Sequence, residues 1–213
     1  LFMASKPLVS FDFAIKFLLK DKGNYDIVEG FLTALLHKEL KGPLKITALL
    51  DTESNKERDI HKKTIADLVV EDQMGQKYII EIERQHTADF SHKACFNTSR
   101  LIVDSIARKD KIITVKKVFH ISILYFTWGD MKKPLYHGKT LIKEIDTEEL
   151  VDLKMRGRDG KIYQLGHVFP EYLFISVPLF NDIIKSELDE WLYVLKHDEV
   201  KAEFKSPYMK RLS

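Results

Sequence analysis

The sequence lacks the features that mark several classes of protein. Cys95 is the only cysteine among 213 residues, so the chain cannot form an internal disulfide bond or hold zinc through several cysteines. A reducing compartment, the cytoplasm, is therefore the expected location. No run reaches the roughly 18 apolar residues that a membrane span needs, and no basic segment followed by an apolar core opens the chain. We expect no membrane association and no signal peptide.

An excess of one charge is also missing. The formal net charge is only +2, from 34 basic and 32 acidic residues, so any DNA-binding surface has to be a local patch. Hydrophobic residues make up 45% and charged residues 31%, as in ordinary soluble proteins. The length suits a single domain over residues 1–213. The charged stretch 205–213 leaves open whether a C-terminal extension is missing.

The order of apolar patterns predicts an α/β fold. Helical spacing covers residues 11–40, with a break at Gly23-Asn24, and recurs over 90–107 and 182–195. Runs of β-branched and aromatic residues predict strands over 44–50, 64–70, 77–83, 115–126 and 173–177, and turn residues 71–76 join the second and third into a hairpin. Tyr136, His137 and residues 156–158 are expected in loops. This order is typical of a mixed sheet flanked by helices.

Acidic residues gather on one face of the predicted hairpin. Side chains alternate along a strand, so Glu81 and Glu83 share a face with Gln85. A turn centred near Met74 puts Asp67 opposite Glu81, with Cβ atoms about 5 Å apart. Carboxylates so close repel one another, and a hard cation removes that repulsion. The pattern therefore indicates a site for Mg²⁺, or Mn²⁺, between Asp67 and Glu81.

An ordinary half-exposed strand also alternates acidic residues with isoleucine, so the spacing alone does not distinguish a metal site from a solvated strand face. Asp67 favours the metal site, because aspartate is depleted in apolar strands and costly there unless it is paired or bound to metal. In a metal site the third carboxylate, Glu83, could position the attacking water or accept its proton.

Several segments, in order, resemble a known family. The resemblance is to the PD-(D/E)XK nuclease family transposases, which include recombination-promoting nucleases, and it covers residues 11–19, 24–36, 63–70, 75–83, 118–124 and 189–196. The resemblance implies a restriction-endonuclease-like fold, Mg²⁺-dependent endonuclease activity on DNA, and a role in the transposition or recombination of mobile DNA. Asp67 and Glu81 match the two metal-binding acids of the family, and together with Glu83 they form the expected catalytic set.

Glu83 departs from the pattern, because it stands where the superfamily has lysine. A carboxylate there could be a base or a metal ligand, and the enzyme would remain active. Alternatively the site is degraded, and the chain is a non-catalytic DNA-binding or assembly module. A third alternative is a metal-dependent phosphatase acting on small molecules, against which the lack of a glycine-rich phosphate loop argues.

Further residues are candidates for supporting roles. Asp12 and Lys16 lie four apart on the first helix, either near the active site or as a surface ion pair. Glu29 either contributes an acid to the metal or lies on the polar face of the second helix. Gln85 either contacts substrate or simply ends its strand.

Basic residues that follow the acidic strand could hold DNA phosphates, although a charge-rich helix is more often just a solvated face. They are Lys93, Arg100 and Arg108. The sequence leaves open whether the chain forms a homo-oligomer.

Overall fold

The fold is built on a six-stranded sheet. The computed structural model describes residues 25–40, 42–50, 67–106, 114–158 and 160–212. The strands stand in the order β1-β2-β3-β4-β8-β5. Their bounds are β1 Ile46–Leu49, β2 Leu68–Asp72, β3 Lys77–Glu83, β4 Val118–Leu124, β8 Glu171–Ser176 and β5 Leu135–Gly138. Pairing is antiparallel from β1 to β3, parallel from β3 through β4 to β8, and antiparallel at β5, so the predicted mixed sheet is confirmed.

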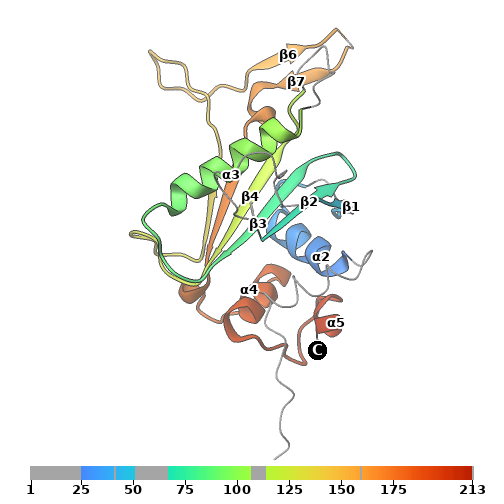
Figure 1. Ribbon diagram of the computed structural model, residues 1–213, viewed down its shortest axis with the longest axis vertical. Helices are drawn as coiled ribbons and strands as arrows, with labels where there is room; N and C mark the ends of the chain where they lie inside the picture. Colours follow the sequence, from blue (N-terminus) through green and yellow to red (C-terminus); the bar gives the residue numbers. More distant parts are fainter. Residues whose placement is uncertain (1–24, 41, 51–66, 107–113, 159, 213) are drawn as a thin grey trace, which may run out of the picture.

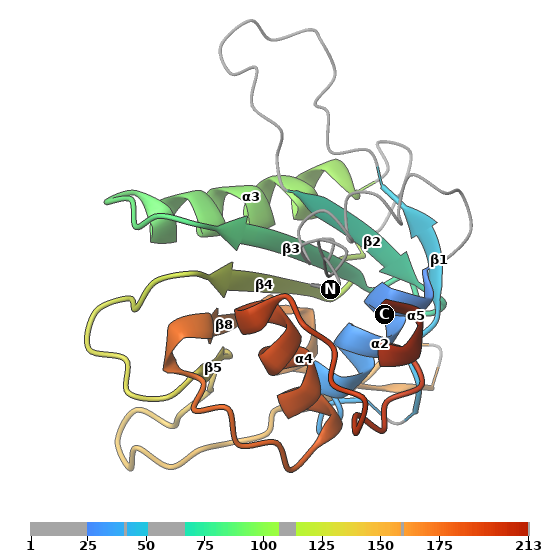
Figure 2. The same cartoon turned by 90° about the horizontal axis from the view of Figure 1, so that it is seen from below.

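Helices cover both faces of this sheet. Helix α3 (Phe90–Asp104) lies along one face, and α2 (Asp26–Leu35) and α4 (Glu187–His197) lie on the other (Figures 1 and 2). The other described helices are short: η1 (Leu165–Val168), η2 (Val177–Leu179) and α5 (Met209–Leu212). Two more strands, β6 (Lys154–Arg156) and β7 (Ile162–Gln164), form a separate hairpin. Among the helices of the described residues, none has the length and hydropathy that crossing a membrane requires.

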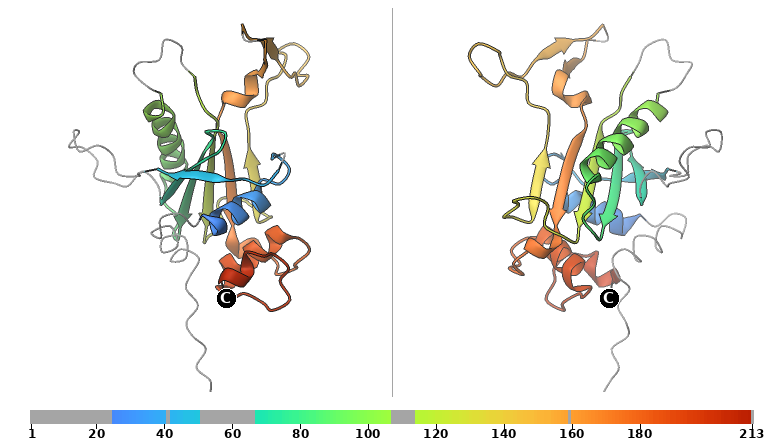
Figure 3. Two further views of the ribbon diagram at one scale, coloured as in Figure 1. Left: turned by 90° about the vertical axis from the view of Figure 1, so that its right-hand side faces the viewer. Right: turned by 60° about the vertical axis from the view of Figure 1, so that its left-hand side comes forward.

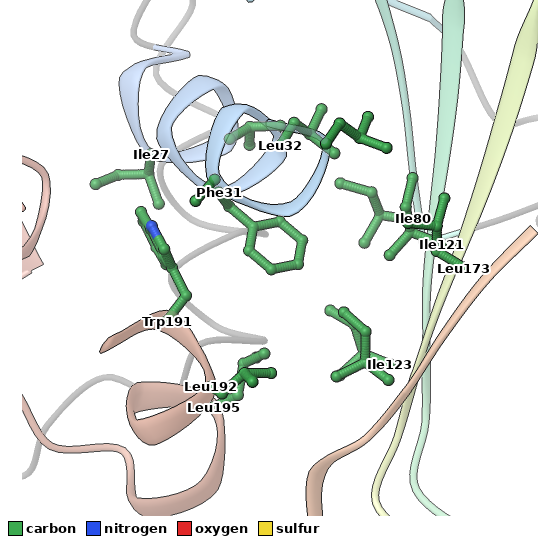
Figure 4. Packing of buried hydrophobic residues seen from close by; sticks show 14 of the residues in the cluster. Ile27, Phe31, Leu32, Ile80, Ile121, Ile123, Leu173, Trp191, Leu192 and Leu195 are labelled. Atoms are coloured by element: carbon green, nitrogen blue, oxygen red, sulfur yellow. The ribbon is translucent and has the colours of Figure 1, made fainter. Parts of the chain in front are cut away.

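Strand alternation divides the buried residues between the two faces. Tyr78 and Ile80 of β3 pack with α2 and α4, where Phe31 and Trp191 meet at 5.8 Å between ring centroids (Figure 4). Ile79, between them in sequence, faces the other way, against a smaller group under α3. The same alternation puts every second residue of β2 and β4 under α3. The functional consequence is that polar residues at those positions meet α3.

The structure corrects one predicted helix start and two predicted loops. The helix expected over 182–195 begins at Glu187, because Asp182 has a positive φ of 63° and Ser186 caps the helix by accepting the N–H of Asp189. Tyr136 and His137 lie in β5 and not in a loop, and Arg156 lies in β6. These strands are only four and three residues long, too short to show a periodic pattern.

Candidate active site

The predicted pairing within the acidic hairpin is confirmed. Strands β2 and β3 are antiparallel, with Leu68 opposite Ile80 and Val69 opposite Ile79. Extending this register by one residue puts Asp67 opposite Glu81. Because Val69 and Ile79 face α3, Asp67, Glu81 and Glu83 belong to that same face. The hairpin thus presents three carboxylates beneath one helix.

The expectation that Asp67 lies within an apolar strand is wrong, because it lies directly before β2 and is exposed. Its Oδ2 accepts a hydrogen bond from the backbone N–H of Ile82 at 2.8 Å. Since the ladder between the strands ends at Leu68, the side chain of Asp67 continues it by binding the next backbone donor of β3. This contact fixes the carboxylate beside the end of β3, where Glu81 and Glu83 emerge.

Glu81 is buried, with 2% of its surface exposed, and both of its carboxylate oxygens are engaged. Asn97 of α3 donates to Oε1 at 2.5 Å, and His120 Nε2 lies 3.1 Å from Oε2. The other ring nitrogen of His120 is 2.8 Å from the hydroxyl of Thr98, which itself donates to the carbonyl of Ala94. Oε1 accepts a hydrogen bond from Asn97, Oε2 lies within hydrogen-bond distance of His120, and a carboxylate oxygen has two lone pairs. The network holds the carboxylate in one orientation and leaves it able to bind a cation.

Glu83 forms an ion pair with Lys93 on the first turn of α3, at 2.5 Å. Partial burial acts to lower the pKa of Lys93, but the hydrogen bond to Glu83 and the charges of Glu81, Glu83 and Asp67 outweigh burial and raise it. The lysine therefore stays protonated, and its ammonium sits in the field of all three carboxylates. The site combines three negative groups with one fixed positive group.

The residues fit a cation held by two carboxylates better than one held by three. Within the described ranges, no group of three His, Cys, Asp or Glu side chains could hold a metal ion. Glu83 instead binds Lys93, so the expected convergence of all three acids is not what these residues show. Asp67 and Glu81 remain as an opposed oxygen pair. One or two carboxylates, completed by water and substrate phosphate, are a common donor set for Mg²⁺.

Glu29 is not brought to this site. It is buried on α2, where its carboxylate accepts the backbone N–H of Ile46 at 2.8 Å and the ammonium of Lys45 at 2.9 Å. Ile46 pairs with Asp72, at the far end of β2 from Asp67, roughly 17 Å away at about 3.4 Å per residue. The alternative of a solvated polar face is also wrong, because Glu29 is 5% exposed. Its role is to bind the start of β1.

The remaining predicted residues have different placements. Gln85 is exposed in the bend after β3, which ends at Glu83. Arg100 lies on α3 and contacts Asp104 at 3.5 Å. Asp12, Lys16 and Arg108 lie outside the described residues.

Sequence reasoning missed the residues of α3 and β4 that hold the acids. Asn97 and Thr98 occupy the buried stripe of α3, where the helical period predicts apolar side chains. His120 interrupts a fully buried, otherwise mainly apolar strand. Polar residues in buried positions require hydrogen-bond partners. Their occurrence at these positions was the one sign in the sequence that they contact other polar groups.

We expect Glu29→Ala to destabilise the fold without affecting the site. Removing the carboxylate leaves the buried N–H of Ile46 unsatisfied, which costs about 1–3 kcal/mol in unfolding free energy. Urea unfolding followed by circular dichroism measures this. Lys45→Ala, which removes only the exposed partner, should change stability little. A Glu29→Ala protein as stable as wild type would contradict the assigned role.

Comparison with known proteins gives the family. The model of the PD-(D/E)XK nuclease family transposases matches residues 9–156, which is more than half of the chain and includes the acidic hairpin and α3. The chain belongs to this family, as the ordered segments predicted, and its mixed sheet between helices agrees with a restriction-endonuclease-like fold. Membership implies a nuclease related to transposition, with DNA as its substrate. No curated protein and no solved structure matches the chain.

Proposed function

We propose that the chain is a metal-dependent endonuclease that hydrolyses DNA phosphodiester bonds during the transposition or recombination of mobile DNA. The observation that carries the proposal is geometric: Asp67 and Glu81 are opposed on one face of the sheet, and the ion pair of Lys93 with Glu83 lies beside them. The family match supports the nuclease class.

Asp67 and Glu81 are the residues that would hold Mg²⁺ or Mn²⁺. When bound, the cation supplies charge that polarises the phosphodiester and lowers the pKa of a bound water. Asn97 and His120 fix the orientation of Glu81, so that this carboxylate need not reorganise. Asp67 is held equally by the backbone of Ile82. Positioning of this kind is what distinguishes a catalytic pair from two neighbouring acids.

Lys93 takes the role that the superfamily lysine would have at position 83. Its ammonium, oriented by Glu83, can stabilise the negative charge that develops on the attacked phosphate. Glu83 then acts as a positioning residue for Lys93 rather than as the base. The lysine comes from the helix that follows β3 instead of from β3 itself.

The test is conversion of supercoiled plasmid by the purified chain. We expect nicked and linear products with Mg²⁺ or Mn²⁺ and none with a chelator, because the cation provides most of the charge stabilisation at the phosphate. Cutting that continues in the chelator would contradict the metal requirement. DNA binding without cutting in either metal, at high protein concentration, would favour the binding-module alternative.

A further inference from the structure

An arm over residues 139–168 stands off the end of the main sheet (Figures 1 and 3). It contains the hairpin of β6 and β7 and the connection to it from β5. More than half of the exposed large hydrophobic side chains of the described residues belong to this arm: Leu141, Ile145, Leu150, Leu153, Met155, Ile162, Tyr163, Leu165 and Val168. The density of exposed apolar groups marks the arm as an interaction surface.

The β6–β7 hairpin presents one apolar face to solvent. Met155 is opposite Tyr163, and Leu153 and Leu165 extend the same row beyond the strands, joined by a backbone hydrogen bond of 2.9 Å. These four side chains are 68%, 49%, 49% and 44% exposed, respectively. The other face is largely polar, since Gln164 and Lys154 both bind Asp152 there. An amphipathic hairpin of two short strands is marginally stable without a partner for its apolar face.

The arm also carries two opposite and balanced charges. Residues 143–149, which we call the acidic loop, contain four acidic side chains and one lysine, for a net charge of −3. Residues 154–161, the basic tip of the hairpin, contain four basic side chains and one aspartate, for a net charge of +3. Figure 1 shows the acidic loop and the hairpin extending in opposite directions above the sheet. The arm therefore has one negative part and one positive part, with exposed apolar side chains within and between them.

This distribution fits a second copy of the same chain. In a two-fold pairing the same surface meets itself, so a patch with one acidic and one basic end becomes complementary when the copies are antiparallel. Nucleic acid fits poorly, because the charges of the two ends cancel and the exposed face is apolar. We propose that the arm is a dimerisation surface, with the acidic loop of each copy on the basic tip of the other and the apolar hairpin faces packed between them.

Charge reversal at each end gives a specific test. The first variant, Asp146→Lys with Glu149→Lys, changes the net charge of the acidic loop from −3 to +1. The second variant, Arg156→Glu with Arg158→Glu, changes the net charge of the basic tip from +3 to −1. All four side chains are exposed. Each variant alone brings like charges together, so we expect at least a tenfold weaker dimer. Mixed in equal amounts, the two variants regain both contacts, and dimers should reappear.

The measurement is sedimentation velocity over a wide range of protein concentration, without DNA or metal, so that it is independent of the nuclease proposal. Wild type should reach twice the monomer mass of 24.9 kDa. Met155→Asp should stay monomeric, also when it is mixed with either charge-reversal variant. Unchanged circular dichroism should confirm that each variant folds. A wild type that is monomeric throughout would overturn the proposal. Dimers that survive both reversals, or variants that fail to recover on mixing, would also overturn it.

Discussion

Asp67→Ala should lower the single-turnover rate of DNA cleavage by at least about a thousandfold, which corresponds to about 4 kcal/mol of lost transition-state stabilisation. The reason is that, in the proposed site, Asp67 and Glu81 are the two carboxylates of the described residues that would hold the cation, and the orientation of Asp67 is fixed by Ile82. Glu81→Ala should have an effect of the same size. It also leaves Asn97 without its carboxylate partner, so Glu81→Gln is the better-matched variant.

DNA affinity should change far less than the rate, because phosphate binding rests mainly on basic residues elsewhere. Asp104→Ala is the control, since it removes an exposed acid at the end of α3, where Asp104 contacts Arg100, while the site is left intact. Quenched-flow cleavage and fluorescence anisotropy on the same duplex give the two quantities. Asp67→Ala protein that folds normally and cuts within tenfold of wild type would remove Asp67 from the mechanism.

Lys93→Ala should lower the cleavage rate about 100- to 1,000-fold, as the loss of one fixed donor to transition-state charge does in other enzymes. Lys38→Ala is the control and should be near wild type, because Lys38 is an exposed lysine just after α2, which covers the other face of the sheet. The decisive variant adds Glu83→Lys to Lys93→Ala, which moves the lysine from the helix to the strand position of the superfamily. We expect this double variant to recover part of the lost rate.

The double variant separates two roles of Glu83. If Glu83 only positions Lys93, a lysine at position 83 replaces both side chains and activity returns. If Glu83 is itself a base or a metal ligand, the double variant stays as inactive as Lys93→Ala or falls further. A Lys93→Ala protein with the wild-type rate would show instead that the ion pair with Glu83 is only structural.

The hairpin and its register could be predicted from the sequence, because alternation and turn residues depend on neighbours along the chain. Asp67 opposite Glu81 follows from the turn near Met74 alone, and the pairing of Leu68 with Ile80 agrees with it. The central strands and α3 were also predictable, since each is long enough to show its period. The family resemblance rested on the hairpin and on β4, together with segments nearer the two ends of the sequence.

The surroundings of the acids could not be predicted in this way. Lys93 reaches Glu83 only because α3 folds back across β3. The sequence suggested Lys93 as a DNA contact but gave no sign that its side chain pairs with Glu83. His120 and Asn97 meet at Glu81 from β4 and α3, 39 and 16 residues away in the sequence. Glu29 was a candidate ligand because the sequence of a helix does not say which face of the sheet that helix covers. Contacts between elements require the three-dimensional arrangement.

Binding of Mn²⁺, followed by electron paramagnetic resonance, tests most directly whether Asp67 and Glu81 hold a cation. The titration is made with wild type, Asp67→Asn and Glu29→Gln, each with a DNA duplex whose linkages cannot be hydrolysed, because substrate phosphate completes the donor set. We predict a saturable Mn²⁺ site in wild type and Glu29→Gln that is lost in Asp67→Asn. Retention of the site in Asp67→Asn, or its loss in Glu29→Gln, would contradict the assignment of the active site.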